Sequence, residues 1–356
     1  MAKVLVSLFK EENLSEFVEL SQTEYSSLDT TDASHVRWKH IDSPYGASTY
    51  IRLIKNDKTI GRALLQPRLM YTDRGEFHSA CIGDVLINSL HRSPPTNFIN
   101  LTKSSANVPK FSSVYHTSNE VTEAFYQKLF RFPNPFSLKA YGFPVRLTNL
   151  FFKISGYRIN CLDWLVSPFH WLNNFFVSIL MRLSKLDVSE RLPDDEMLSE
   201  LSLKSLHNSG PFLSRSNSFL KWRLIDAPLW KAKVFCISRK GRFLGYVATR
   251  SIKLEGLRFF VVIDFLMDTE MVFFERIAFR LWLIKQTVGS GDDALFTMIN
   301  PISKASRVCV GFPFTKIPDK FLPHRTPIFV RAYGDESKEV QCQKSMHMTL
   351  ADLDYF

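Results

Sequence analysis

The sequence predicts an α+β protein made of two tandem copies of one domain, each a mixed, mostly antiparallel sheet flanked by helices. Three observations predict this arrangement. A motif recurs at a fixed spacing, the same order of strands and turns follows each occurrence, and the length of 356 residues suits two domains of ordinary size. Hydrophobic residues make up 45% of the chain, enough for a sizeable core.

The recurring motif joins a tryptophan to an aspartate and a proline. Residues 38–44 read WKHIDSP and residues 222–228 read WRLIDAP, so the two tryptophans are 184 positions apart. Gly61 and Gly245 keep the same spacing. Because the motif occurs in both copies, we expect it to have a structural role at the start of each domain.

The stretches after the motif predict the same elements twice. Polar turns separate three strands, and a helix and a further strand follow; in the second copy, helical periodicity runs from Phe273 to Lys285. Each third strand carries a late aspartate, and an asparagine follows the last strand 35 positions later (Asp84 to Asn119) or 36 positions later (Asp264 to Asn300). The predicted strands are 50–55, 60–68, 77–86 and 111–116, then 234–239, 243–250, 257–266 and 294–299.

These elements divide the chain into four parts. We expect an N-terminal domain at 1–150, an aromatic-rich connecting segment at 151–190, a C-terminal domain at 191–334 and a polar, loosely docked tail at 335–356. Within the connecting segment, residues 162–181 are too polar for a membrane span because Asp163, Pro168 and His170 interrupt them. A helix packed on its own domain is the preferred reading, and peripheral membrane contact through 162–183 stays open.

Charge and cysteine content narrow the class of ligand. The net charge of +10 suits an anionic ligand such as a nucleotide, CoA or an acidic glycan, and it also suits an anionic membrane surface. The basic residues are scattered singly, which disfavours nucleic acid. Five cysteines without a CxxC spacing disfavour a metal site and a disulfide framework, so we expect a cytoplasmic protein, with the inner face of the membrane as an alternative.

Residues 83–92, GDVLINSLHR, resemble the fourth strand of the GNAT acyltransferase superfamily, written GDVxxxPxYR, with the family's eight-residue spacing from Asp84 to Arg92. The resemblance implies an acyl-CoA site in the first copy, with the pyrophosphate held by backbone N–H groups at a helix start. Pro95 and Asn97 stand where the family has small residues, and proline has no N–H to donate, so this loop must be altered. The cofactor-binding residues implied are Val85, Leu86, Arg92, Ser93, Thr96, Asn97 and Asn119.

Residues 119–129, NEVTEAFYQKL, resemble the family's NxxAxxLYEKLGF, with seven residues from Asn119 to Tyr126. The resemblance implies that Asn119 binds the cofactor arm and that the Tyr126 hydroxyl protonates the leaving thiolate, because a phenol keeps its proton at neutral pH. A packed helix face is the alternative for Tyr126. The second copy repeats the frame from Asn300 but has Arg307 at the tyrosine position, so it keeps the fold without the chemistry.

A general base must deprotonate the acceptor amine, and three side chains on or beside the third strand are candidates. Glu76, His78 and Asp84 are these residues, and strand alternation puts His78 and Asp84 on one face. The resemblance implies an N-acyltransferase that uses acetyl-CoA or another acyl-CoA on an amino-sugar, sugar nucleotide, glycan or similar small amine, as in surface-polysaccharide biosynthesis. Two alternatives stay open: a catalytically inactive binding protein of the same fold, and a Fem-like aminoacyl transferase that uses aminoacyl-tRNA.

Overall fold

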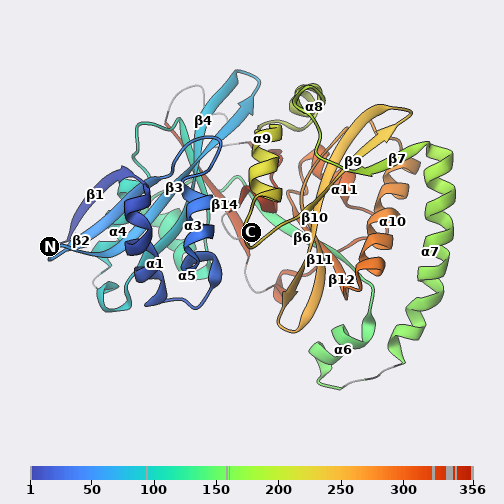
Figure 1. Ribbon diagram of the computed structural model, residues 1–356, viewed down its shortest axis with the longest axis horizontal. Helices are drawn as coiled ribbons and strands as arrows, with labels where there is room; N and C mark the ends of the chain where they lie inside the picture. Colours follow the sequence, from blue (N-terminus) through green and yellow to red (C-terminus); the bar gives the residue numbers. More distant parts are fainter. Residues whose placement is uncertain are drawn as a thin grey trace.

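The computed structural model describes residues 2–93, 95–157, 159, 161–322, 325–333, 340 and 343–353 (Figure 1). These residues form one continuous 14-stranded sheet whose main path is β1-β2-β3-β4-β5-β14-β6-β12-β11-β10-β9-β7. Most neighbouring strands are antiparallel, and β4–β5 and β11–β12 are parallel. The predicted α+β class, a mixed sheet with flanking helices, is confirmed.

The two copies have the same order of main elements, and among the described residues the short strands β8 and β13 occur in the second copy alone. The first contains β1 (Lys3–Leu8), α1 (Leu14–Gln22), α2 (Leu28–Thr31), α3 (Ala33–His40), β2 (Thr49–Lys55), β3 (Lys58–Thr72), β4 (Gly75–Ile87), α4 (Thr96–Ser105), β5 (Ser113–Thr117), α5 (Glu120–Ala124), the π-helical turn η3 (Phe125–Leu129) and β6 (Phe136–Pro144). Helices α6 (Leu147–Ser155) and α7 (Leu162–Ser184) connect the copies. The second contains β7 (Leu186–Glu190), α8 (Asp195–Ser209), β8 (Phe212–Leu213), α9 (Asn217–Leu220), the π-helical turn η4 (Lys221–Ile225), β9 (Lys233–Arg239), β10 (Arg242–Leu254), β11 (Leu257–Met267), α10 (Phe273–Ser290), β12 (Ala294–Ile299), α11 (Lys304–Cys309), β13 (Thr315–Lys316) and β14 (Thr326–Ala332).

Local backbone geometry explains why the first hairpin of each copy closes where the sequence predicts. Asn56 and Asp57 have φ of 50° and 57°, and Lys240 and Gly241 have φ of 51° and 83°. Two consecutive left-handed residues form the tight turn that matches the twist of paired strands, and Asn, Asp and Gly tolerate this conformation best. The two hairpins are therefore built by the same device.

The two copies exchange their last strands at the centre of the sheet. Strand β6 of the first copy pairs with β12 of the second, from Ala294↔Pro144 to Ile299↔Lys139. Strand β14 of the second copy pairs with β5 of the first, from Ile328↔Thr117 to Ala332↔Ser113. The exchanged strands also pair with each other. Each half of the sheet is thus completed by a strand from the other half. The predicted domain boundaries at residues 150 and 190 do not include this exchange.

The repeated tryptophans meet where the copies pack together. The indole N–H of Trp38 donates to the Trp222 carbonyl at 2.8 Å, and that of Trp222 donates to the Trp38 carbonyl at 2.9 Å. The rings stack with centroids 5.2 Å apart. Both residues belong to the helical segment before the first hairpin of their copy, which confirms the predicted structural role. A surface hollow beside them is lined by five pairs at the same 184-residue spacing: Ser34/Ser218, Arg37/Lys221, Trp38/Trp222, Asp42/Asp226 and Pro44/Pro228.

The C-terminal segment corrects one expectation. The described residues of the predicted loose tail are mostly buried, with Met346, Met348 and Leu350 at 0% exposure. They belong to a core cluster that also contains Trp38 and Trp222. Their apolar side chains alternate with polar residues, such as His347 and Thr349, that hydrogen-bond to Phe265 and Asp264. The segment therefore has a polar composition although it is buried.

We predict that Trp38→Phe and Trp222→Phe lower the free energy of unfolding by similar amounts, about 1–2 kcal/mol each. Phenylalanine keeps the ring stacking but leaves one buried carbonyl without its donor. Urea unfolding followed by circular dichroism measures the loss. Trp164→Phe, at a side chain that is 78% exposed, is the control and should change stability little. A loss confined to one of the two buried tryptophans would contradict the reciprocal arrangement.

Candidate functional site

Strands β4 and β5 separate in the first copy. Their parallel pairing covers only Ser79–Cys81 with Ser113–Tyr115. Beyond it, the pairing of β4 with β3 shifts register between Arg62 and Leu64, and Asp84 takes a positive φ of 48°. Such a bulge leaves backbone groups outside the ladder and bends the strand. The β4 edge that begins at Ile82, including half-buried Val85 and buried Leu86, therefore offers backbone partners to an extended ligand.

The bulge overturns the expected alternation at Asp84. Ala80 and Ile82 point into the core beneath α4. The Asp84 carboxylate instead reaches α3, where Lys39 Nζ and His40 Nε2 both lie 2.8 Å from Oδ2. The positive φ at Asp84 interrupts the two-residue period, so its side chain leaves the face that carries Ile82.

Asp84 is held as a buried ion pair. Burial alone would raise its pKa, but the Lys39 ammonium and the hydrogen bond from His40 outweigh this and lower the pKa well below its usual range. A carboxylate of that kind is a poor proton acceptor. Ser48 Oγ lies 3.0 Å from His40 Nδ1, yet Ser48 and His40 are 0% exposed. This Ser–His–Asp chain therefore fastens α3 to the bulge and does not offer a nucleophile to a substrate.

Glu76 and His78 lie near the start of β4, where both side chains are exposed. They precede Cys81, the last residue paired with β5, by five and three positions. At about 3.3 Å per residue, these positions lie roughly 16 and 10 Å back along the strand. Burial and a hydrogen bond to Glu76 raise the pKa of Tyr71 to about 12. The structure thus places both base candidates beside the hairpin turn, apart from the bulge.

Tyr126 lies in η3 and packs against His116 at the end of β5. The two ring centroids are 3.7 Å apart, and Tyr126 is 4% exposed. His116 Nδ1 lies 3.1 Å from the Thr117 carbonyl, while its Nε2 has no hydrogen-bond partner among the described residues. Burial lowers the pKa of His116 to about 4, so the imidazole is neutral at pH 7. The sequence predicts the strand that ends at His116, and a histidine at that end is a usable signal that the list of candidate residues does not include.

The predicted pyrophosphate loop lies at the start of α4. Arg92 donates to the Ile87 carbonyl at 3.0 Å and to Glu24 at 2.6 Å. Ser93 and Thr96 have exposed side chains, Asn97 Nδ2 donates to the His91 carbonyl at 2.9 Å, and Pro94 lies outside the described residues.

Asn119, predicted to bind the cofactor arm, caps a helix. Its Oδ1 accepts a hydrogen bond from the Thr122 backbone N–H at 2.9 Å, which satisfies one of the free donors at the start of α5. The carbonyl end of the side chain is therefore engaged within the first copy.

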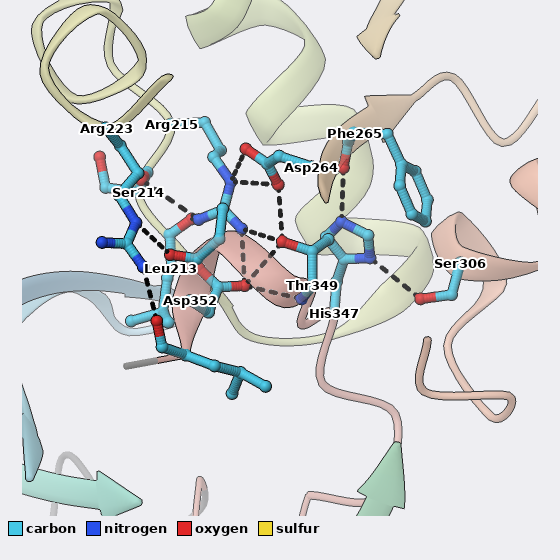
Figure 2. A network of polar contacts seen from close by, with 12 residues as sticks. Leu213, Ser214, Arg215, Arg223, Asp264, Phe265, Ser306, His347, Thr349 and Asp352 are labelled. Carbon is cyan, nitrogen blue, oxygen red and sulfur yellow. Dashed lines mark hydrogen bonds and ion pairs between the residues drawn. The ribbon is translucent and has the colours of Figure 1, made fainter. Parts of the chain in front are cut away.

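In the second copy, the C-terminal segment (residues 343–353) contacts the residues that correspond to the candidate site of the first copy. Asn300, which corresponds to Asn119, donates through Nδ2 to the Lys344 and Met346 carbonyls at 2.7 and 2.8 Å. His347 Nε2 lies 2.8 Å from the Phe265 carbonyl of β11, and its Nδ1 lies 3.1 Å from Ser306 Oγ (Figure 2). The chain thus spans from β11 to α11 and satisfies groups beside the second β-bulge, at Ala248/Thr249.

A buried ionic network anchors this segment. Arg215 lies 3.0 Å from Asp264 and 2.6 Å from Asp352, and the Thr349 hydroxyl donates to Asp264 at 2.7 Å (Figure 2). Burial alone would lower the pKa of Arg215, but the two carboxylates raise it well above its usual value. The Tyr115 hydroxyl donates to the Asp352 carbonyl at 2.9 Å, so the network also touches β5 of the first copy.

Comparisons with known proteins identify the fold. Neither a protein-family model nor a curated protein sequence matches the chain. A GCN5-related N-acetyltransferase from Anabaena variabilis has a TM-score of 0.56 at 11% identity, over 93% of this chain and 73% of its own. A probable N-acyltransferase of unknown function from Enterococcus faecalis has a TM-score of 0.53 at 12% identity, over 96% and 74%. Saccharomyces cerevisiae N-myristoyltransferase with bound myristoyl-CoA has a TM-score of 0.56 at 9% identity, over 100% and 90%. The expected GNAT-like fold is confirmed over nearly the whole chain.

We predict that His116 makes the protein sensitive to acid. The unfolded imidazole titrates near pH 6.5, whereas the pKa of folded His116 is about 4. Its stabilising contribution is therefore complete above pH 6.5 and is lost as the pH falls toward 4. Between pH 7 and pH 5 this residue should remove about 2 kcal/mol from the free energy of unfolding.

Urea unfolding at the two pH values measures this loss. His116→Phe should reduce the pH dependence by about 2 kcal/mol because the new ring does not ionise. His78→Asn, at an exposed side chain, is the matched control. Equal pH dependence in His116→Phe and the unaltered protein would assign the acid sensitivity to other groups.

Proposed function

We propose that the protein is an acyl-CoA-dependent N-acyltransferase whose site lies in the first copy, between β4 and β5. The observation that carries the proposal is the contrast between the copies. The C-terminal segment engages Asn300 and Phe265 in the second copy, whereas β4 of the first copy departs from β5 after Cys81. The fold shared with N-acyltransferases, one of them crystallised with myristoyl-CoA, supports the same function.

The residues of the first copy fit an extended, anionic co-substrate. Val85 and Leu86 lie on the edge that can hydrogen-bond the pantetheine arm, and the overall charge of +10 favours a phosphorylated ligand. Arg92 is exposed enough to meet a phosphate, although its bond to Glu24 competes. Ser93, Thr96 and Asn97 supply further donors, which offset the missing N–H of Pro95.

The chemistry assigned to this site is transfer of the acyl group from sulfur to nitrogen. As the acceptor amine attacks the thioester carbonyl, the C–S bond breaks and the thiolate takes a proton from the Tyr126 hydroxyl. The amine proton leaves to solvent water, because burial lowers the pKa of His116 to about 4 and makes the imidazole beside Tyr126 a weak base. Because Tyr126 and His116 are both buried, the thioester reaches them only by displacing neighbouring side chains.

None of the three base candidates predicted from the sequence receives the amine proton in this proposal. The Asp84 carboxylate is held in an ion pair with Lys39, and Glu76 and His78 lie back toward the hairpin turn. The acceptor that we propose is a small amine such as an amino-sugar, a sugar nucleotide or a glycan in surface-polysaccharide assembly, and the compartment that we propose is the cytoplasm. Free thiols at Cys81, Cys161, Cys236 and Cys309 suit a reducing compartment.

We predict that acyl-CoA stabilises the folded protein. Ligand at 100 times its dissociation constant should add about 2.7 kcal/mol to the free energy of unfolding, seen as a rise in Tm. Acetyl-CoA and myristoyl-CoA are tested separately, with free transfer RNA as a third arm. Arg92→Ala should weaken the effect, and Arg307→Ala, in the second copy, should leave it intact. Stabilisation by transfer RNA alone would favour an aminoacyl transferase instead.

We predict that Tyr126→Phe lowers turnover by about 10²–10⁴-fold, the range for a positioned acid. Acyl-CoA affinity should barely change, because the ring still packs on His116 and only the transition-state proton transfer is lost. Single-turnover kinetics with the stabilising acyl-CoA measure the rate. Arg307→Ala is the control at the equivalent position of the second copy. An equal loss of turnover in both variants would show that the chemistry is assigned to the wrong copy. Binding of acyl-CoA without turnover would favour a catalytically inactive binding protein.

A further inference from the structure

Helices α6 and α7 form an insertion between the copies and carry an exposed apolar surface. Figure 1 shows α7 at the outer edge of the molecule, beside α10. Exposure of the large side chains on this surface ranges from 37% at Ile179 to 78% at Trp164. We name it the connector face and define it by Phe151, Phe152, Trp164, Leu165, Trp171, Leu172, Phe175, Phe176, Ile179 and Leu183.

Helix α7 is apolar on two sides. One side packs against α10, where Val177 is buried and buried Asn173 donates to the Leu281 carbonyl at 3.3 Å. The other side is part of the connector face, whose residues on α7 recur at i, i+1, i+7, i+8, i+11, i+12 and i+15 spacing from Trp164. This apolar stripe continues to Leu183, roughly 30 Å along the helix. A helix that needed only its contact with α10 would have a polar outer side.

The segment that carries the connector face has an excess of basic residues, one of which, Lys153, is paired with Glu255 at 2.9 Å. Residues 146–185 contain five Lys or Arg residues and a single acid, Asp163. Asp163 turns inward, where its carboxylate accepts a hydrogen bond from the Thr148 backbone N–H at 2.9 Å. Arg182 and Lys185 are exposed at the C-terminal end of α7. A second copy of the chain would bring the same positive rim against this one, whereas an anionic lipid surface complements it.

The composition of the face also matches a lipid interface. Tryptophan and phenylalanine, with basic residues at the margin, are the side chains favoured at the boundary between headgroups and acyl chains. Among the described residues, none of the helices has the length and apolar character that crossing a bilayer requires. We propose that the connector face binds the surface of an anionic lipid bilayer, with α7 lying in the plane of the interface.

The test is co-sedimentation of the full chain with two kinds of vesicle, phosphatidylcholine alone and phosphatidylcholine containing phosphatidylglycerol. We expect binding to the anionic vesicles that is weakened by salt. The variant Trp171→Ser/Phe175→Ser should reduce that binding at least about tenfold, because two large rings leave the interface. The control Phe312→Ser/Phe321→Ser changes two exposed aromatic residues outside the connector face, at 75% and 59% exposure, and should leave binding unchanged.

Three results would overturn the proposal. The first is absence of binding to the anionic vesicles by the unaltered protein. The second is equal loss in the two double variants, with native circular dichroism in both. The third is a concentration-dependent dimer in sedimentation velocity that Trp171→Ser/Phe175→Ser abolishes while vesicle binding persists, which would assign the face to a second copy. If acyl-CoA still raises the Tm of Trp171→Ser/Phe175→Ser, the proposed acyl-CoA site and the proposed lipid-binding face are independent of each other.

Discussion

The exchange of β6 and β14 is the constraint on which the rest of the structure depends. A parallel pair such as β4–β5 or β11–β12 leaves the far edge of its last strand unsatisfied, and buried backbone groups without partners are costly. Here β14 covers the edge of β5 and β6 covers the edge of β12. Each copy takes that strand from the other, so the two halves form one continuous sheet. The reciprocal hydrogen bonds of Trp38 and Trp222 then fix the packing of the halves.

A pair of buried aspartates, one in each copy, shows how the two similar halves differ. Each copy carries one on the strand that bulges, and each aspartate meets a buried cation: Lys39 beside Asp84, and Arg215 beside Asp264. A buried charge is tolerated only when it is paired, so both sites are saturated. In the second copy Arg215 also holds Asp352, which draws the C-terminal segment into the region beside β11. Because the C-terminal segment lies beside β11 in the second copy, the proposed acyl-CoA site is in the first copy.

The proposed chemistry and the connector face lie far apart in the molecule. Figure 1 shows α4 and α5 in one half and α7 at the outer edge of the other. Membrane contact through α7 would therefore leave the edge of β4 facing water, where acyl-CoA is dissolved. The buried imidazole of His116 beside Tyr126 stays neutral, because burial disfavours its charged form.

The sequence by itself determined the local and repetitive features. The spacing from Trp38 to Trp222, the Asn56-Asp57 turn and the α+β fold class follow from patterns within a few residues, which short-range sterics and periodicity control. Only the tertiary structure decided which strands are neighbours, because alternation marks a strand without naming its partner. It also decided that Asp84 turns toward α3, since a single bulge reverses the faces of a strand. The burial of His116 and of Met346–Leu353 was decided there too, because His116 stacks on Phe329 and the Leu353 carbonyl accepts from Arg223, each more than a hundred positions away.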